Sequence, residues 1–459
     1  MDIITASSVE KLRRYFQSGA TRPLDFRLQQ LRALRNALLQ HEQELNAALK
    51  TDLHKSVEET WVTETGMVLS ELNHTIRQLK RWMAPERVPT NLLNLPSSSR
   101  IIREPLGVVL IIGPWNYPVQ LSLIPLVGAI AAGNCVVLKP GEAAVASCAV
   151  MRKIIQQTFS PEYILFADGE GADVIPPLMQ QFTFDHVFYT GGPRAGREIY
   201  RMAAERLVPV TLELGGKSPC LVAADANIEV AARRIVSTKF SNAGQMCVAP
   251  DYLLVHQQVA DKLIAAIKKC ILRFYGEQPE TSPNYCRLIN KRQYDRLISY
   301  LGQGEIIAGG RFRSEELFIE PALLLNPPLD SPVMQEEIFG PVLPVLTYET
   351  EEQAAAIINN HPNPLAFYIF TTSKKTADRW MSAVPFGGGC VNNCSWHLTN
   401  PHLPFGGRGG SGMGRYHGRF SFDTFSHQKS VMSTPTWFDP SIKYPPMNGK
   451  IGLFKKVIR

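Results

Sequence analysis

The stretch from residue 108 to residue 214 constrains the fold more than any other part of the sequence. It alternates short apolar segments, which predict strands, with longer segments that predict helices. Strands that alternate with helices favour a parallel, doubly wound sheet, and such sheets bind nucleotides at the carboxyl ends of their strands. The predicted strands are 108–112, 136–139, 163–167, 186–189 and 210–214, and the predicted helices are 119–132, 143–157 and 194–206.

Helix-like periodicity precedes this region, and a second α/β stretch follows it from about residue 219 to 404. In that stretch, predicted helices at 225–240 and 259–274 flank a predicted strand at 252–256. The segment 87–103 is rich in Pro, Ser and Asn and predicts a connection or an exposed ribbon between domains. Five leucines near the N-terminus recur at steps of three or four residues and mark one helix face: Leu24, Leu28, Leu31, Leu34 and Leu38.

Charge and cysteine content exclude several classes of function. The formal net charge of +7 is spread along 459 residues without a basic stripe, which argues against nucleic-acid binding and suits an acidic substrate or cofactor. The eight cysteines occur singly, as expected of free thiols in a reducing compartment, so we expect a cytoplasmic protein. Cys390 and Cys394 lack a second pair of ligands, and no metal site is predicted. The N-terminus has no signal-peptide pattern, and the apolar run 119–132 is too short to span a bilayer.

Cys247 is a candidate nucleophile. Gly244 and Pro250 bracket it in a predicted loop that follows a helix. A loop thiol attacks as a thiolate when its surroundings favour the anion. The alternative is a buried structural cysteine, which is the commoner role of the residue.

Glu213 and Asn116 are candidates for a base and for an oxyanion donor. Glu213 stands between two leucines at a strand end, where burial would raise its pKa towards the range of a general base; the alternative is a salt-bridged structural glutamate. Asn116 lies between Pro114 and Pro118, after the first strong strand, where a stiffly held amide suits oxyanion stabilisation. The alternative for Asn116 is a turn residue that bonds its own backbone.

Two further strand ends have the composition of nucleotide contacts. Gly191, Gly192 and Gly196 follow a strand and open a helix, and the free amides of a helix N-terminus bind phosphates. The run matches neither the dinucleotide fingerprint GxGxxG nor a P-loop. Lys139 and Glu142 also follow a strand, where they would reach ribose hydroxyls or form an ordinary turn.

In their order along the chain, these segments resemble the aldehyde dehydrogenase superfamily, from about residue 10 to 445. The run 404–427 is similar to the class 3 branch, which includes fatty and aromatic aldehyde dehydrogenases. Gly141 and Met246 depart from the family, which commonly has a small residue such as Ser at the first position and Thr at the second. The motifs that carry the resemblance are 114–118, 139–142, 190–192, 213–219, 244–247 and 336–341.

The resemblance implies a Rossmann-type parallel-sheet cofactor domain, an α/β catalytic domain and a small oligomerisation ribbon. Class 3 resemblance also makes a homodimer the expected assembly. The basic, amphipathic tail is expected to make peripheral membrane contact at most. The expected divisions are 1–83 with 102–211 for the NAD(P)-binding domain, 212–417 for the catalytic domain, 84–101 with 418–434 for the bridging segment, and 435–459 for the tail.

The resemblance also assigns roles. Cys247 would be the nucleophile, Glu213 the base, and Asn116 with the Cys247 amide the oxyanion hole. The expected cofactor, NAD or NADP, would have its adenosine ribose held by Lys139 and Glu142, its pyrophosphate near Gly191, Gly192 and Gly196, and its nicotinamide end near Glu337 and Phe339. The residues expected to line an apolar substrate tunnel are Tyr117, Leu398, Thr399, Phe405 and His417.

The expected reaction is oxidation of medium- or long-chain aliphatic or aromatic aldehydes to carboxylic acids through a thioester on Cys247. One alternative is a CoA-acylating relative, which passes the thioester to another acceptor; Glu213 argues against it because hydrolysis needs a water-activating base. A second alternative is a non-catalytic binding protein on the same fold, against which the intact Cys247, Glu213 and Asn116 speak.

Overall fold

Continuous apolar runs form the first sheet, whose central strand β3 is buried at all five positions. The computed structural model describes residues 6–457. Five strands run parallel in the order β7-β6-β3-β4-β5, and the short β17 pairs antiparallel with β7. The expected doubly wound sheet is confirmed. Its strands are β3 (Val108–Ile112), β4 (Cys135–Lys139), β5 (Ile164–Phe166), β6 (His186–Thr190), β7 (Val210–Glu213) and β17 (Gly412–Met413).

Helices cover this sheet, and one of them, α6 (Pro118–Ala132), is buried along its whole length because it is apolar on all sides. The N-terminal helices pack against α6 and α7. The helix α8 was not predicted, since Pro176 and Pro177 lie inside it. The other helices of this unit are α1 (Ala6–Gln17), α2 (Leu24–Gln40), α3 (Glu42–Leu53), α4 (Val57–Thr60), the π-helical η1 (Trp61–Thr65), α5 (Gly66–Met83), α7 (Val145–Thr158), α8 (Gly171–Gln181) and α9 (Pro193–Ala204).

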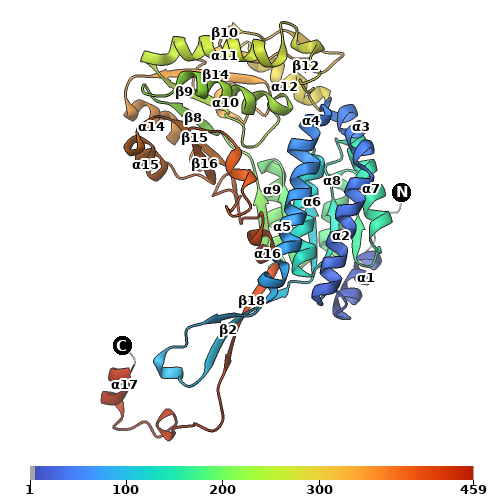
Figure 1. Ribbon diagram of the computed structural model, residues 1–459, viewed down its shortest axis with the longest axis vertical. Helices are drawn as coiled ribbons and strands as arrows, with labels where there is room; N and C mark the ends of the chain where they lie inside the picture. The colour runs from blue at the N-terminus through green and yellow to red at the C-terminus, as the bar shows by residue number, and fades with distance from the viewer. Residues whose placement is uncertain (1–5, 458–459) are drawn as a thin grey trace.

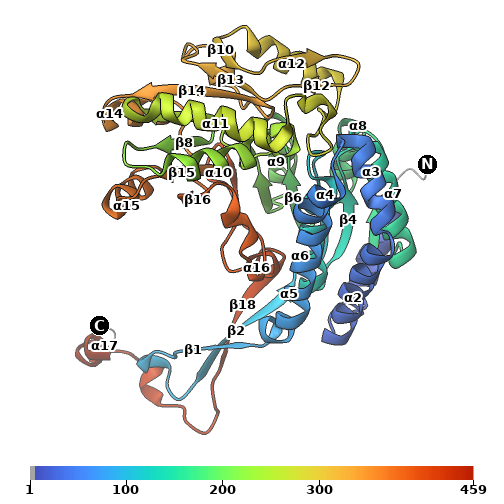
Figure 2. The ribbon, with the colours of Figure 1, turned by 45° about the horizontal axis from the view of Figure 1, so that its top comes forward.

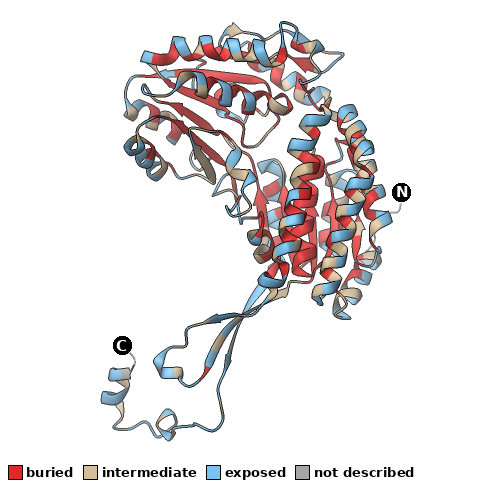
Figure 3. Ribbon diagram, in the orientation of Figure 1, coloured by how far each residue is buried: buried red, intermediate tan, exposed pale blue. Residues whose placement is uncertain are grey.

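The second sheet has seven strands in the order β10-β13-β14-β9-β8-β15-β16, parallel except for β10 at one edge. Figure 3 shows the strands of both sheets as the buried layer of their units. The strands are β8 (Pro219–Val222), β9 (Tyr252–His256), β10 (Glu305–Ala308), β13 (Ala322–Leu325), β14 (Val342–Tyr348), β15 (Ala366–Phe370) and β16 (Gly388–Val391). The helices are α10 (Ile228–Phe240), η3 (Ser241–Gly244), η4 (Gln257–Val259), α11 (Ala260–Tyr275), η5 (Pro279–Thr281), α12 (Lys291–Leu301), α13 (Pro332–Gln335), α14 (Glu351–Asn359) and α15 (Lys374–Ala383), with the hairpin β11 (Phe312–Arg313) and β12 (Phe318–Ile319).

A thin arm projects from the two units and carries the C-terminus (Figures 1 and 2). Its three antiparallel strands, β1 (Glu86–Val88), β2 (Ser98–Pro105) and β18 (Ser426–Ser433), pair in that order. Large apolar side chains are exposed along it: Leu92, Leu93, Leu95, Met432 and Trp437. The remaining short elements are η2 (Leu92–Asn94), η6 (Trp396–Thr399), α16 (Arg419–Thr424), η7 (Ser441–Lys443) and α17 (Ile451–Val457).

The interval expected for the catalytic domain, 212–417, also contributes a strand to the first sheet. This strand is β17 (Gly412–Met413), which pairs with β7. The domain limits stay a prediction.

In the described part of the chain, no helix combines the length and apolarity needed to cross a bilayer. All eight cysteines are free thiols, and residues 6–457 contain no cluster of three acidic, His or Cys side chains arranged to hold a metal ion.

Candidate active site

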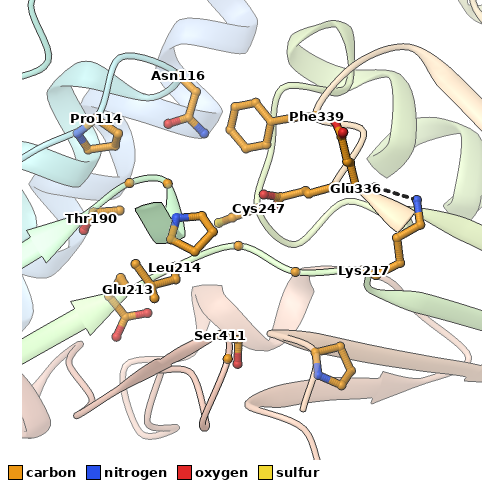
Figure 4. A pocket seen from close by; sticks show the side chains of 18 of the residues that line it. Pro114, Asn116, Thr190, Glu213, Leu214, Lys217, Cys247, Glu336, Phe339 and Ser411 are labelled. Carbon is orange, nitrogen blue, oxygen red and sulfur yellow. Dashed lines mark hydrogen bonds between the residues drawn. The ribbon is translucent and has the colours of Figure 1, made fainter. Parts of the chain in front are cut away.

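The ends of the first sheet's strands open into a cavity of about 730 Å³. The loops after β3, β6 and β7 form one side of it, and the loop that carries Cys247 forms another. Figure 4 shows Cys247 at the centre of these segments, between Glu213, Asn116 and Phe339. Further lining comes from Arg197, from α12, and from 335–339, 360–364 and 410–411.

Cys247 follows an unusual turn. After α10, the backbone of Asn242, Ala243 and Gly244 is left-handed, with φ of 50°, 51° and 76°. Only glycine adopts this conformation freely, and a Cβ on Gly244 would lie 2.2 Å from the Gly340 carbonyl oxygen. The turn directs Cys247 into the cavity. Burial raises the pKa of its thiol, and the carboxyls of Glu337 and Glu213 raise it further, so the resting group is a thiol.

Glu213 ends β7 and is 3% exposed. Neither carboxyl oxygen has a hydrogen-bond partner among the residues that the structure describes, and none of the recorded ion pairs includes it. Burial alone raises its pKa well above the ordinary range. In Figure 4 the carboxyl group turns away from Cys247, although both residues line the same cavity. A buried, unpartnered carboxyl in a cleft is typical of a functional acid or base.

Asn116 is 2% exposed and bonds across to the nucleophile loop. Its Nδ2 donates to the backbone oxygen of Gln245 at 3.0 Å. Its own backbone oxygen accepts from Lys55 Nζ at 3.2 Å and from Asn242 Nδ2 at 2.8 Å. An amide nitrogen carries two hydrogens, so the second is available for an oxyanion in the cavity.

Gly191 and Gly192 line the cavity, whereas Gly196 lies behind it. Gly192 caps the N-terminus of α9, and a Cβ there would meet nothing within 4 Å. A Cβ on Gly196 would lie 2.7 Å from Leu214 Cδ2, so this glycine lets the helix approach the chain beyond β7. Open space at a helix start whose cap has no side chain fits a phosphate group.

Lys139 and Glu142 lie beside the cavity, at the end of the neighbouring strand β4. Lys139 is 2% exposed, and its Nζ bonds Glu142 Oε2 at 2.7 Å. The turn between them needs glycine, because a Cβ on Gly141 would lie 2.6 Å from the Pro114 carbonyl carbon. This close approach accounts for Gly141, one of the two departures from the family pattern.

Glu337 and Phe339 both line the cavity. Burial raises the pKa of Glu337 to about 8, and its Oε1 has no partner among the described residues. A Cβ on Gly215 would lie 2.0 Å from Glu337 Oε2, so only glycine leaves room for this carboxyl. Phe339 has a φ of 50°, and its ring meets Trp115 edge-on at 5.4 Å. An orphaned carboxyl oxygen at a cavity wall suits a ribose hydroxyl.

None of the five residues expected to line a substrate tunnel lines this cavity. Phe405 and His417 are buried with ring centroids 5.4 Å apart. Tyr117 is buried beneath Lys55 Nζ, which lies 4.0 Å from its ring centre. Leu398 is half-buried, and Thr399 is exposed. The structure therefore brings together Phe405, His417 and the backbone of Leu398, which hydrogen-bonds the His417 ring.

Sequence reasoning missed several residues around the site. Tyr416 packs against both Phe405 and His417, at 5.6 and 4.4 Å between ring centres. Lys217 forms a buried ion pair with Asp251 at 2.6 Å and donates to the Glu336 backbone oxygen at 2.8 Å, the bond drawn in Figure 4. Tyr416 lies in the run 404–427 and Lys217 in the motif 213–219, so both stand beside residues that the sequence identified. Among the cavity residues, Thr190 lies in the motif 190–192, whereas Arg292 and Arg296 of α12 carry no sequence signal.

Comparison with known proteins gives a consistent result. Residues 5–431 match the model of the aldehyde dehydrogenase family. The 4,4'-diaponeurosporen-aldehyde dehydrogenase of Staphylococcus aureus is 44% identical over 443 residues, 96% of each chain. Aldehyde dehydrogenase family 3 member B1 of Homo sapiens is 42% identical over 96% of this chain and 94% of its own.

Two solved structures extend the likeness to the fold. A substrate-bound state of Staphylococcus aureus AldH superposes with a TM-score of 0.97 at 43% identity, over 100% of both chains. The indole-3-acetaldehyde dehydrogenase AldA of P. syringae, in complex with NAD+ and IAA, has a TM-score of 0.86 at 28% identity, over 94% of this chain and 90% of its own. With its cysteine, carboxylate and amide gathered on one cavity, this chain belongs to the aldehyde dehydrogenase family, in its class 3-like branch.

Proposed function

We propose that this oxidoreductase converts medium- or long-chain aliphatic or aromatic aldehydes to carboxylic acids, with NAD or NADP, through a thioester on Cys247. One observation carries the proposal: Cys247, Glu213 and Asn116 line a single cavity. Each has the environment its role requires. The thiol lies beyond a turn that directs it inward, the carboxyl is buried without a partner, and the amide keeps one free hydrogen.

The reaction follows from these three groups. The Cys247 thiol gives its proton to solvent and its sulfur attacks the aldehyde carbon, so that the carbonyl oxygen becomes an oxyanion within reach of Asn116. A nicotinamide held beside Glu337 and Phe339 would supply the acceptor for the hydride of this carbon, which would leave a thioester on Cys247. Glu213 then takes a proton from water, whose oxygen attacks the thioester and releases the acid and the Cys247 thiolate. Because the Glu213 carboxyl points away from the sulfur in Figure 4, its side chain turns before this step.

The residues present fit a dinucleotide. The exposed start of α9 at Gly191 and Gly192 suits the pyrophosphate, with Gly196 allowing the helix to approach. The orphaned oxygen of Glu337 suits the nicotinamide ribose, and the ring of Phe339 would lie against the nicotinamide end. Lys139 and Glu142 would hold the adenosine ribose. The P. syringae neighbour was solved with NAD+.

The aldehyde would enter from the side of the buried aromatic group formed by Phe405, Tyr416 and His417. Burial lowers the pKa of His417 to about 4, so its ring is neutral and compatible with an apolar chain. Tyr117, Leu398 and Thr399 would complete this passage. The S. aureus relative is named for 4,4'-diaponeurosporen-aldehyde, which supports an aldehyde substrate.

We further propose a cytoplasmic homodimer. Eight free thiols suit a reducing compartment. The arm formed by β1, β2 and β18 exposes Leu93, Met432 and Trp437, and contiguous exposed apolar surface is typical of a protein interface. The tail beyond residue 435 ends in the helix α17, whose exposed Ile451 and Leu453 accompany Lys455 and Lys456; contact with a membrane would be peripheral at most.

Replacement of Cys247 by Ser and by Ala tests the proposal. We expect NADH or NADPH formation to be lost in both, and an acyl adduct on Cys247 to be trapped by mass spectrometry in the parent enzyme. We also expect a higher kcat/KM for hexanal than for acetaldehyde, and no dependence on CoA. Undiminished oxidation in the variants refutes the thioester, and acyl-CoA as the product would support the acylating alternative.

A further inference from the structure

Behind Asn116, on the side away from the cavity, lies a buried ion pair that the reaction does not use directly. Lys55 Nζ and Glu64 Oε1 are 2.6 Å apart, and both side chains are 0% exposed. Lys55 follows α3, and Glu64 lies in the π-helical turn η1. Both residues belong to the N-terminal helical segment and neither lines the 730 Å³ cavity.

The pair holds the junction between the loop 113–117 and α6. Lys55 donates to the Asn116 backbone oxygen at 3.2 Å, and its ammonium lies 4.0 Å from the ring centre of Tyr117. Glu64 Oε2 accepts from the amides of Val119 and Gln120 at 3.1 and 2.9 Å, in the first turn of α6. The carboxylate therefore caps the helix that follows the loop, while the ammonium fixes the peptide that precedes it.

The nucleophile loop also holds Asn116. Asn242 Nδ2 donates to the Asn116 backbone oxygen, and Asn116 Nδ2 donates to the Gln245 backbone oxygen. The carboxylate of Glu59 anchors this loop as well, because it accepts a hydrogen bond from the Asn242 amide at 2.7 Å. The Asn116 peptide thus lies between donors from two different segments of the chain, and Lys55 is the charged one.

Stability alone is a weak reason for such a pair. Replacing a buried ion pair by uncharged side chains of similar shape is often neutral or stabilising. Position is a stronger reason, because a donor displaced by about 1 Å can cost about 100-fold in rate.

Resting on the proposed function, we propose that Lys55 and Glu64 are positioning residues, which fix the Asn116 side chain in the orientation that serves the oxyanion at Cys247. They act through the Asn116 carbonyl and the first turn of α6, and touch neither substrate nor cofactor.

The double variant Lys55→Met/Glu64→Gln tests this inference, because it removes both charges and keeps the side-chain volumes close. We expect it to fold with a melting temperature near that of the parent. Its single-turnover rate of NADH formation should fall about 10- to 100-fold, while the Kd for NAD+ and the KM for hexanal stay within about threefold. The single variant Lys55→Arg, which keeps a cationic donor, should retain more of the parent's single-turnover rate than the double variant does.

Arg27→Met is the matched control. Arg27 is 5% exposed and donates to the backbone oxygens of Thr21 and Ala131, remote from the cavity. This variant should lose stability and keep its single-turnover rate. The inference is overturned if the double variant turns over like the parent, or if the rates of all variants follow their melting temperatures.

A readout independent of activity separates this inference from the proposed function. Amide hydrogen exchange of the peptide 113–121 should accelerate in the double variant and stay unchanged in Arg27→Met. If the parent enzyme oxidises no aldehyde, the proposed function fails, and unchanged exchange in the double variant would then reject the loop-holding role as well. Normal parent activity with unchanged exchange and rate rejects the inference alone.

Discussion

Two buried carboxylates, Glu64 and Glu213, differ in the hydrogen-bond donors around them: Glu64 is paired with Lys55 outside the cavity, and Glu213 lines the cavity. Glu64 receives a hydrogen bond from Lys55 and two more from the backbone of α6. Glu213 receives none from any described residue. Since both are almost completely removed from solvent, the difference lies in the donors that the surrounding chain provides.

The comparison separates Glu64, a carboxylate that supports the structure, from Glu213, the carboxylate proposed as the catalytic base. A buried charge is costly unless it is paired, so a protein that folds around Glu64 provides partners for it. Leaving Glu213 without partners keeps its proton affinity high, as a general base requires. The same substitution, Glu to Gln, should therefore have different consequences at the two positions.

The largest effect is expected for Glu213→Gln. Steady-state turnover should fall by about 10²- to 10⁴-fold, because water is no longer activated for thioester hydrolysis. The first turnover should survive as a burst of about one NADH per Cys247, since acylation precedes the step that needs the base. Rapid mixing with hexanal and NAD+ measures both quantities. Loss of the burst itself would place Glu213 before the thioester.

Glu64→Gln should instead act on folding. The free energy of unfolding should fall by about 3–5 kcal/mol, because Lys55 is left as a buried charge without a counterion. Glu213→Gln should keep or increase the free energy of unfolding, as it removes a carboxyl that has no partner. Urea denaturation of both variants, followed by circular dichroism, tests the contrast. Equal losses at the two positions would remove the distinction.

The smallest effect within any one pH unit concerns Glu337, the other cavity carboxyl with an unpartnered oxygen. Its pKa is raised from 4.5 to about 8 by burial, so the folded state binds more protons than the unfolded state between these values. Its contribution to stability is complete below the unfolded pKa and is lost as pH rises towards 8. Relative to Glu337→Gln, the parent should lose up to about 1.4 kcal/mol per pH unit there. Parallel stability curves for the two proteins would contradict this.

Much of the fold could be predicted because its pattern is local. The strands at 108–112, 252–256 and their neighbours are continuous apolar runs, and runs of this kind are read directly from sequence. The helix α8 could not be predicted, because it contains Pro176 and Pro177, and proline is normally excluded from the interior of a helix. The pairing of β17 with β7 was equally hidden, since two residues, Gly412 and Met413, carry no periodicity.

For the site, the sequence identified the groups and not their surroundings. Cys247, Glu213 and Asn116 stand in recognisable motifs, and the structure places all three on one cavity. The contact of Lys55 with Asn116 joins residues 61 positions apart, which no local pattern reveals. The missing partners of Glu213 were also beyond prediction, since they depend on everything that packs around the strand end.

The absence of a side chain at Gly215 has a consequence for redesign of the enzyme. The Glu337 carboxyl occupies the volume where a Cβ would be, at 2.0 Å. Any larger residue would expel that carboxyl, so position 337 and the shape of the chain beyond β7 must be altered together. Exchanging Glu337 alone for the shorter Asp would leave the space beside Gly215 unfilled.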